Sequence, residues 1–223
     1  MNVQTNNLHV HIHSHRPNIV YAPHTYTHSF TKWKDPFWLA LDSAIAEATI
    51  MHAAVFVTEF GAPSVEKKLL EMLDQQDMHG VGSTFWPWKE RGGWGMFNHS
   101  GADPALGEGP MKPLHRQALC RILPIATVGL VQQFSYNWTT AAFTLHAVAP
   151  PAISQHATSI LARTTIVFVP AHVPPAPCEV TGAAQFWRSV VAPDGSRQLL
   201  INVTTAGGEY SVSIPGNATW PDV

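Results

Sequence analysis

The chain has 223 residues, of which 45% are hydrophobic and 13% are charged, and its formal net charge is −2. This composition supplies a sizeable core and excludes general disorder. The small net charge gives no electrostatic basis for binding nucleic acid or an anionic membrane, and no apolar run reaches the ~18 residues that span a bilayer.

The first segment, residues 1–17, is polar and rich in histidine, and we expect an irregular leader. It has no apolar stretch of the secretory-signal type. His9, His11, His13 and His15 alternate, and four imidazoles on one face of a strand could bind Zn²⁺ or Cu²⁺. The segment lacks apolar strand character, so a leader or a gene-model artefact is favoured. No metal site and no cofactor is predicted.

Between residues 18 and 117, predicted strands alternate with predicted helices. Apolar runs at 18–22, 53–57 and 79–88 predict strands. The first helix is expected to begin at Asp35 and Pro36 and to run to about Met51, with Phe37, Leu41, Ile45 and Thr49 on its inner stripe. The second is expected from a Ser64 cap to about Met78. Alternating strands and helices indicate βαβ units and a parallel sheet.

A Gly- and Pro-rich loop is expected at 89–112, followed by a short helical segment that ends near Pro124. Beyond this point the residue pattern no longer predicts helices. Strand-like runs follow at 125–137, 141–149, 163–170, 184–191, 198–204 and 209–215, separated by turn signals. Their spacing predicts a small antiparallel β-sandwich over residues 118–223. We place the boundary between the two parts near residue 117.

Glu59 is the strongest candidate for chemistry because it follows an apolar strand and precedes a glycine two residues later in the run VFVTEFG. A carboxylate at the carboxyl end of such a strand can attack an anomeric carbon, and retaining glycosidases need this nucleophile and a second carboxyl about 5 Å away. The alternative is a glutamate that interacts with a helix dipole or an ion-pair partner.

Polar and aromatic residues follow the two neighbouring strands. His24 and Tyr26 are two apart, so an extended chain points both the same way, where a hydroxyl could orient the nucleophile. Trp86 and Trp88 end the third strand, and indole rings stack on the apolar faces of sugars. Core packing is the commoner role of tryptophan. Trp94 and Phe97, in the following Gly-rich loop, could extend an apolar wall.

Taken together, four segments resemble glycoside hydrolase family 5, in its endoglycoceramidase-like branch. The segments are YAPHTY (21–26), VFVTEFGAP (55–63), FWPWKE (85–90) and VGLVQQFSYNWTTAAFTL (128–145). The resemblance implies an α/β part made of the last three βα units of a (β/α)8 TIM barrel (18–117), followed by the family's all-β domain (118–223). It also implies that the barrel half before them is missing.

The same resemblance assigns roles to residues. Glu59 is the implied nucleophile, His24 and Tyr26 are implied active-site residues, and Trp86, Trp88 and Tyr21 are implied substrate contacts. The family's acid/base glutamate follows an asparagine, and no Asn-Glu pair occurs in this sequence. Protonation of the leaving group is therefore expected to be lost, and the chain alone is expected to show no meaningful turnover.

The expected function is hydrolysis of β-linked glycolipids by a retaining two-carboxylate mechanism that this chain carries only in part. The alternatives are a non-catalytic remnant that binds glycan or glycolipid, and an unstable product without function. The expected partner is a glycolipid or β-glycoside, with no nucleic acid. Peripheral membrane contact through the lipid is compatible with the aromatic strand ends, although no amphipathic basic helix supports it.

The sequence is compatible with two cellular locations. Sequons begin at Asn98, Asn137, Asn202 and Asn217, and they matter only if an upstream signal directs the chain into the secretory pathway; otherwise a cytoplasmic location is expected. Cys120 and Cys178 could pair under oxidising conditions, with two free thiols slightly favoured.

Overall fold

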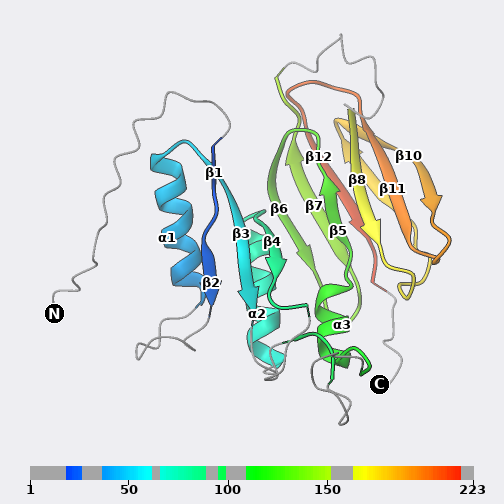
Figure 1. The fold of residues 1–223 in the computed structure, drawn as a ribbon. Coiled ribbons are helices and arrows are strands. Elements are labelled where there is room, and N and C mark those ends of the chain that lie inside the picture. Colours follow the sequence, from blue (N-terminus) through cyan, green and yellow to red (C-terminus); the bar gives the residue numbers. More distant parts are fainter. Residues whose placement is uncertain are drawn as a thin grey trace.

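The structure is a computed structural model that describes residues 19–26, 37–61, 66–88, 95–98, 109–151 and 163–216. The leader predicted at residues 1–17, with its four histidines, lies outside these ranges. The described chain forms a small parallel sheet with helices, followed by two antiparallel sheets packed face to face (Figure 1). Among the helices within these ranges, none is long and apolar enough to cross a bilayer.

The first part is a run of parallel strands joined by helices. In chain order it contains β1 (Val20–Tyr21), β2 (His24–Tyr26), α1 (Phe37–Ile50), β3 (Ala54–Gly61), α2 (Glu66–Met78) and β4 (Gly82–Phe85). β1 and β2 both pair with β3, and Thr58 N donates to Pro23 O between them. They therefore act as one interrupted strand on one side of β3, while β4 pairs on the other side.

The helices cover this sheet with small and apolar residues. Leu41, Ala44 and Ala48 of α1 are buried, and Leu69 and Met72 are buried on the inner side of α2. The predicted bounds of both helices are close to the observed ones. Thr49 was wrongly expected on the inner stripe: it is exposed, and its hydroxyl donates to Ile45 O within the helix.

The second part is the predicted antiparallel β-sandwich. α3 (Pro113–Leu119) leads into sheets of order β10-β11-β8-β5 and β6-β7-β12-β9. The prediction that this helix ends near Pro124 is wrong, because Leu123 and Pro124 pair with β8 as part of a strand. The strands are β5 (Leu123–Ala126), β6 (Leu130–Tyr136), β7 (Phe143–Val148), β8 (Thr164–Val169), β9 (Glu179–Gly182), β10 (Ala184–Val191), β11 (Arg197–Val203) and β12 (Glu209–Ile214). Cys120 and Cys178 are free thiols.

One predicted strand is in fact two. The run at 125–137 was expected to be continuous, but β5 and β6 belong to different sheets, and the chain crosses between them at Gly129. This glycine has φ +95°, and a Cβ added to it would lie 2.0 Å from Val148 O. No L side chain fits that close approach, so the crossing needs glycine.

A closed set of hydrogen bonds joins the two sheets at this crossing. The Tyr210 hydroxyl of β12 donates to Val128 O at 2.9 Å and lies 2.7 Å from the Thr165 hydroxyl of β8. Val128 N donates to the same Thr165 oxygen at 3.0 Å. Because Tyr210 is buried, each polar group in this set needs a hydrogen-bond partner inside the protein, and the other members of the set supply it.

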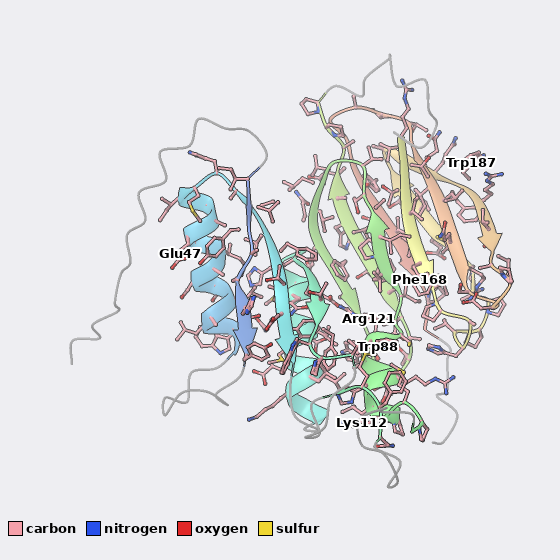
Figure 2. The ribbon with its side chains drawn as sticks, in the orientation of Figure 1. Glu47, Trp88, Lys112, Arg121, Phe168 and Trp187 are labelled. Atoms are coloured by element: carbon pink, nitrogen blue, oxygen red, sulfur yellow. The ribbon has the colours of Figure 1, made fainter. Side chains whose placement is uncertain are left out.

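The two parts meet at a buried polar interface. Arg121, which follows α3, pairs with Asp77 of α2, and Trp138 Nε1 donates to Asp74 Oδ1 at 2.7 Å. The Arg121 guanidinium also lies over the Trp138 ring, 5.4 Å from its centroid. Figure 2 shows Arg121 where α2 and α3 meet the sandwich. This interface fixes α2, and through it the parallel sheet, against the β-domain.

Candidate functional site

The carboxyl ends of β2, β3 and β4 meet at one edge of the parallel sheet. His24 of β2 lies in register with Glu59 of β3, and Phe60 lies in register with Phe85 of β4. Trp86 follows directly and its backbone N donates to Phe60 O at 2.8 Å. Because the strands are parallel, residues far apart in the sequence come together at this edge.

A bulge in β3 decides which way Glu59 faces. The strand was expected to end at residue 57, but it continues to Gly61, so Glu59 lies inside it rather than after it. Pairing with β4 passes from Val57 directly to Phe60, while the partner advances by only two residues. Val57 and Phe60 can therefore both be buried under the helices, and Glu59 is turned to a partly open position.

Two side chains hold the Glu59 carboxylate by the same oxygen. The Tyr26 hydroxyl donates to Glu59 Oε2 at 2.7 Å, and His24 Nδ1 lies 3.2 Å from that atom. Within the described part of the chain, Glu59 Oε1 has no hydrogen bond. The Glu59 side chain is 33% exposed. One carboxylate oxygen is thus anchored, while the other remains open to an incoming group.

The protonation state of Tyr26 suits this arrangement. Burial raises the pKa of the Tyr26 phenol, and the hydrogen bond and charge of Glu59 raise it further. The phenol therefore stays protonated at working pH and acts as a donor to the carboxylate. Its role in the geometry is to fix the orientation of Glu59.

Two aromatic pairs involve the residues that follow β4, and one of them reaches the Glu59 cluster. The Trp86 ring meets Tyr26 edge-on, with centroids 6.2 Å apart, and is 39% exposed. Trp88 is 61% exposed and meets Phe97 edge-on, with centroids 5.1 Å apart. The exposed indole of Trp86, beside the carboxylate cluster, provides a stacking face for a sugar or an apolar group, and Trp88 provides a second exposed face next to Phe97.

The segment that carries Phe97 is held by a short ladder that the sequence did not predict. Phe97 forms an isolated bridge with Met111, and Lys112 N donates to Met96 O at 2.8 Å. Met96 N in turn donates to Trp88 O at 3.3 Å. The apolar pair Met96–Phe97 amid glycines was the only signal for it in the sequence.

The structure brings together four of the six predicted site residues: Glu59, Tyr26, His24 and Trp86. It places Tyr21 elsewhere, because the Tyr21 hydroxyl donates to the Glu47 carboxylate on α1. Glu47 and Trp88 are labelled in Figure 2, on opposite sides of the parallel sheet. Among the described residues, no group of three or more His, Cys, Asp or Glu forms a candidate metal site.

Comparison with known proteins adds family information for the second part. Residues 121–214 match the glycoside hydrolase family 5 C-terminal domain. A search of curated proteins finds no match. The family match covers the β-sandwich and leaves the parallel sheet to be compared by structure.

Solved structures resemble most of the chain, including residues outside the β-sandwich. The endogalactoceramidase structure matches 90% of this chain and 42% of its own, at 18% identity and a TM-score of 0.64. Endo-glycoceramidase II from Rhodococcus sp. matches 80% of this chain and 38% of its own, at 17% identity and a TM-score of 0.58.

Sterylglucosidase 1 from Cryptococcus neoformans matches 83% of this chain and 32% of its own, at 13% identity and a TM-score of 0.58. The chain therefore spans about two-fifths or less of the length of these proteins. The resemblance to the endoglycoceramidase-like branch of glycoside hydrolase family 5 is confirmed.

Proposed function

We propose that this chain carries the nucleophile side of a retaining β-glycosidase for glycolipids, with Glu59 as the nucleophile. The observation that carries the proposal is the carboxylate of Glu59, held by Tyr26 at 2.7 Å and His24 at 3.2 Å on one oxygen while the other is open. A nucleophile needs this combination of fixed orientation and access. The glycosidase family of the β-domain supports the same chemistry.

The parallel sheet is proposed to be the last three βα units of a (β/α)8 barrel. Its strands are parallel, and along the chain helices connect each strand to the next. The candidate site is at the carboxyl ends of the strands, where such barrels carry their active sites. The likeness to three glycosidase structures supports this assignment.

The other roles follow from the contacts. Tyr26 positions Glu59, and His24, which contacts Glu59 and is 57% exposed, is proposed to bind a sugar hydroxyl. Trp86 and Trp88 offer faces for the sugar and the aglycone. Because the Tyr21 hydroxyl donates to Glu47, a substrate contact by Tyr21 would be one that this oxygen accepts or that its ring makes.

The glycolipid class comes from the similar structures, whose names specify galactoceramide, glycoceramide and steryl glucoside cleavage. Retaining hydrolysis also needs an acid/base carboxyl, and the sequence has no Asn-Glu pair of the family's type. We infer that this chain alone does not protonate a poor leaving group, and that natural glycolipids are not turned over by it.

A substrate that needs no protonation separates the nucleophile from the missing acid. A 2,4-dinitrophenyl 2-deoxy-2-fluoro-β-glycoside loses dinitrophenolate with the bonding electron pair, while a Glu59 oxygen forms the new bond to the anomeric carbon. We expect one glycosyl adduct per chain by intact mass spectrometry, mapped to Glu59 by peptide analysis. Glu59→Gln should give no adduct, and the matched control Glu71→Gln, at an exposed position on α2, should label normally.

Labelling of Glu59→Gln at the unchanged rate, or an adduct on another residue, would contradict the assignment. A second candidate function is glycan binding without catalysis, which the exposure of Trp88 favours. Saturable binding of a glycolipid headgroup by calorimetry, abolished in Trp88→Ala and accompanied by no adduct on Glu59, would select it.

A further inference from the structure

The two outer faces of the β-sandwich differ in polarity. On the sheet β6-β7-β12-β9 most outward side chains are polar, and the exceptions are Leu130 and Val148 at one end. The Ser135 and Thr144 hydroxyls lie 2.8 Å apart, and His146 Nδ1 lies 2.8 Å from the Ser211 hydroxyl. This is the ordinary solvated face of an antiparallel sheet.

The sheet β10-β11-β8-β5 presents a more apolar side, on which Gln185, Gln198 and Asn202 are the polar neighbours of exposed apolar residues. In β8 and β11, Val167, Val169, Leu199 and Ile201 point into the core, so the alternate residues point outward. Register places Phe168 beside Gln198 and Val190, and Ile166 beside Leu200 and Arg188. We use the term apolar outer face for Ile166, Phe168, Trp187, Arg188 and Val190.

A bulge adds the aromatic residue to this face. The register of β10 with β11 shifts between Phe186 and Arg188, so Trp187 is the extra residue. Trp187 is 37% exposed and Val190 is 41% exposed. The Arg188 guanidinium stacks on the Trp187 ring, 4.4 Å from its centroid. Figure 2 shows Trp187 at the far edge of the sandwich from α1, and Phe168 is labelled on the same sheet.

Charge is distributed unequally between the two sheets. The strands of the sheet β10-β11-β8-β5 contain Arg188 and Arg197 and no acidic residue, whereas those of the other sheet contain Glu179 and Glu209 and no Lys or Arg. Arg197 donates to Val173 O at 2.6 Å, so its guanidinium is engaged within the fold. The apolar outer face therefore carries one exposed cation and no carboxylate.

We propose that the apolar outer face is the surface by which this protein lies on a phospholipid bilayer. Tryptophan and arginine suit the headgroup level, because an apolar body can be buried while a polar end reaches water or phosphate. A bilayer provides phosphate for Arg188 and apolar depth for Trp187 and Val190. A second copy of this face would offer Arg188 no carboxylate partner, because the strands of this sheet contain none.

Bilayer binding by the apolar outer face is independent of the chemistry of Glu59. With a net charge of −2, the molecule as a whole is not drawn to anionic lipid, so apolar burial carries the binding. The attachment is expected to survive high salt, unlike binding by a polybasic segment. A protein held at the bilayer would meet glycolipid headgroups at a raised local concentration.

Co-sedimentation with vesicles tests the proposal on the 223-residue chain. Vesicles of phosphatidylcholine, with and without phosphatidylserine, should pellet the protein at low and at high salt. The double variant Trp187→Ala with Val190→Ser should weaken partitioning about tenfold or more, because two apolar side chains no longer leave water. Arg188→Gln should weaken it about fivefold with either vesicle, because its headgroup phosphate contact is lost.

Matched controls keep the outcome clear. Gln133→Ala lies exposed on the polar sheet and should partition like the parent chain, and Glu59→Gln should do the same. Circular dichroism confirms that each variant is folded. A folded parent chain that stays in the supernatant overturns the proposal, as does equal partitioning of the Trp187 double variant.

Two further measurements test the same face independently of vesicles. Sedimentation velocity that shows a dimer abolished by the Trp187 double variant would assign the face to a second copy and overturn the proposal. Asn202 alternates with the core residues of β11 and pairs with Thr164 and Gln185, so it is on the same face. A glycan found on Asn202 by mass spectrometry would hold this face off a bilayer and would also overturn it.

Discussion

The buried pair of Arg121 and Asp77 is the contact whose removal should destabilise the fold most. The Arg121 side chain is 9% exposed and that of Asp77 is 3% exposed, so neither charge is solvated. Burial lowers the pKa of Arg121 to about 10, while the Asp74 carboxylate favours its charged form. Removing one member of such a pair leaves a buried charge uncompensated, at a cost of about 3–5 kcal/mol.

The structure also ranks the two single substitutions. Asp77→Leu leaves Arg121 with Asp74 nearby and with the rings of Trp138 and Phe134, so its cost should fall at the lower end of that range. Arg121→Met leaves Asp77 without its cation, and Asp77 Oδ1 already has no partner in the described part of the chain. Its cost should be the larger, a fall in Tm of about 10 °C or more.

The assay is a double-mutant cycle followed by thermal and denaturant unfolding. Since apolar residues of similar volume can replace a buried ion pair with little net loss, the double variant should be more stable than Arg121→Met alone. The coupling energy is expected to be about 2 kcal/mol or more. Single variants that each lose under about 1 kcal/mol, or strictly additive losses, would refute the argument that this interface is held by a desolvated pair.

Three further outcomes follow from single side chains. Tyr26→Phe removes the donor to Glu59, and the rate of 2-fluoroglycoside labelling should fall about tenfold; an unchanged rate would show that His24 alone orients the carboxylate. Tyr210→Phe breaks the hydrogen-bonded ring and leaves buried polar groups unpaired, so unfolding free energy should fall by about 1–3 kcal/mol, and a loss below a few tenths would contradict that. Burial lowers the pKa of His115 to about 4, with Lys112 adding to the effect, so the unfolded chain binds the proton first. Stability is therefore expected to be full above about pH 6.5 and to fall as the pH drops toward 4. His115→Leu should flatten this part of a pH–stability curve, and a slope unchanged between about pH 7 and 5 would exclude His115 as its source.

Periodicity and capping residues were sufficient to find most of the regular elements. The first two helices begin and end within about two residues of their predicted limits, the third ends about five residues early, and most sandwich strands lie inside the predicted runs. β9 was not predicted, because Glu179–Gly182 is short, has Val180 as its one large apolar side chain and follows a proline-rich stretch. It is a strand because it pairs with β12, a partner about thirty residues later that no local pattern reveals.

Strand register explains which of the predicted site residues lie together. His24 and Glu59 are level on neighbouring strands, so the spacing of His24 and Tyr26 was enough to bring both near the carboxylate. Tyr21 was not predictable in this way. Its position depends on the break between β1 and β2 and on a carboxylate from α1, and both are tertiary features.

The bulge in β3 links the fold to the candidate chemistry. In a regular strand, Val57 and Glu59 would point to the same face, and the carboxylate would be buried under α2 with the apolar core. The extra residue lets Val57 and Phe60 both enter that core while Glu59 turns toward Tyr26. Phe60 then packs edge-on against Phe85, with centroids 5.6 Å apart, immediately before Trp86.

This arrangement ties the direction of Glu59 to the packing of α2, and therefore to the β-domain. α2 is held to the sandwich by Asp77 with Arg121 and by Asp74 with Trp138. If these contacts set the register of the bulge, then Arg121→Met should slow the labelling of Glu59 at temperatures where the chain is still folded, although Arg121 belongs to the other part of the fold. A normal labelling rate in the folded variant would instead mean that β2 and β4 alone hold the bulge.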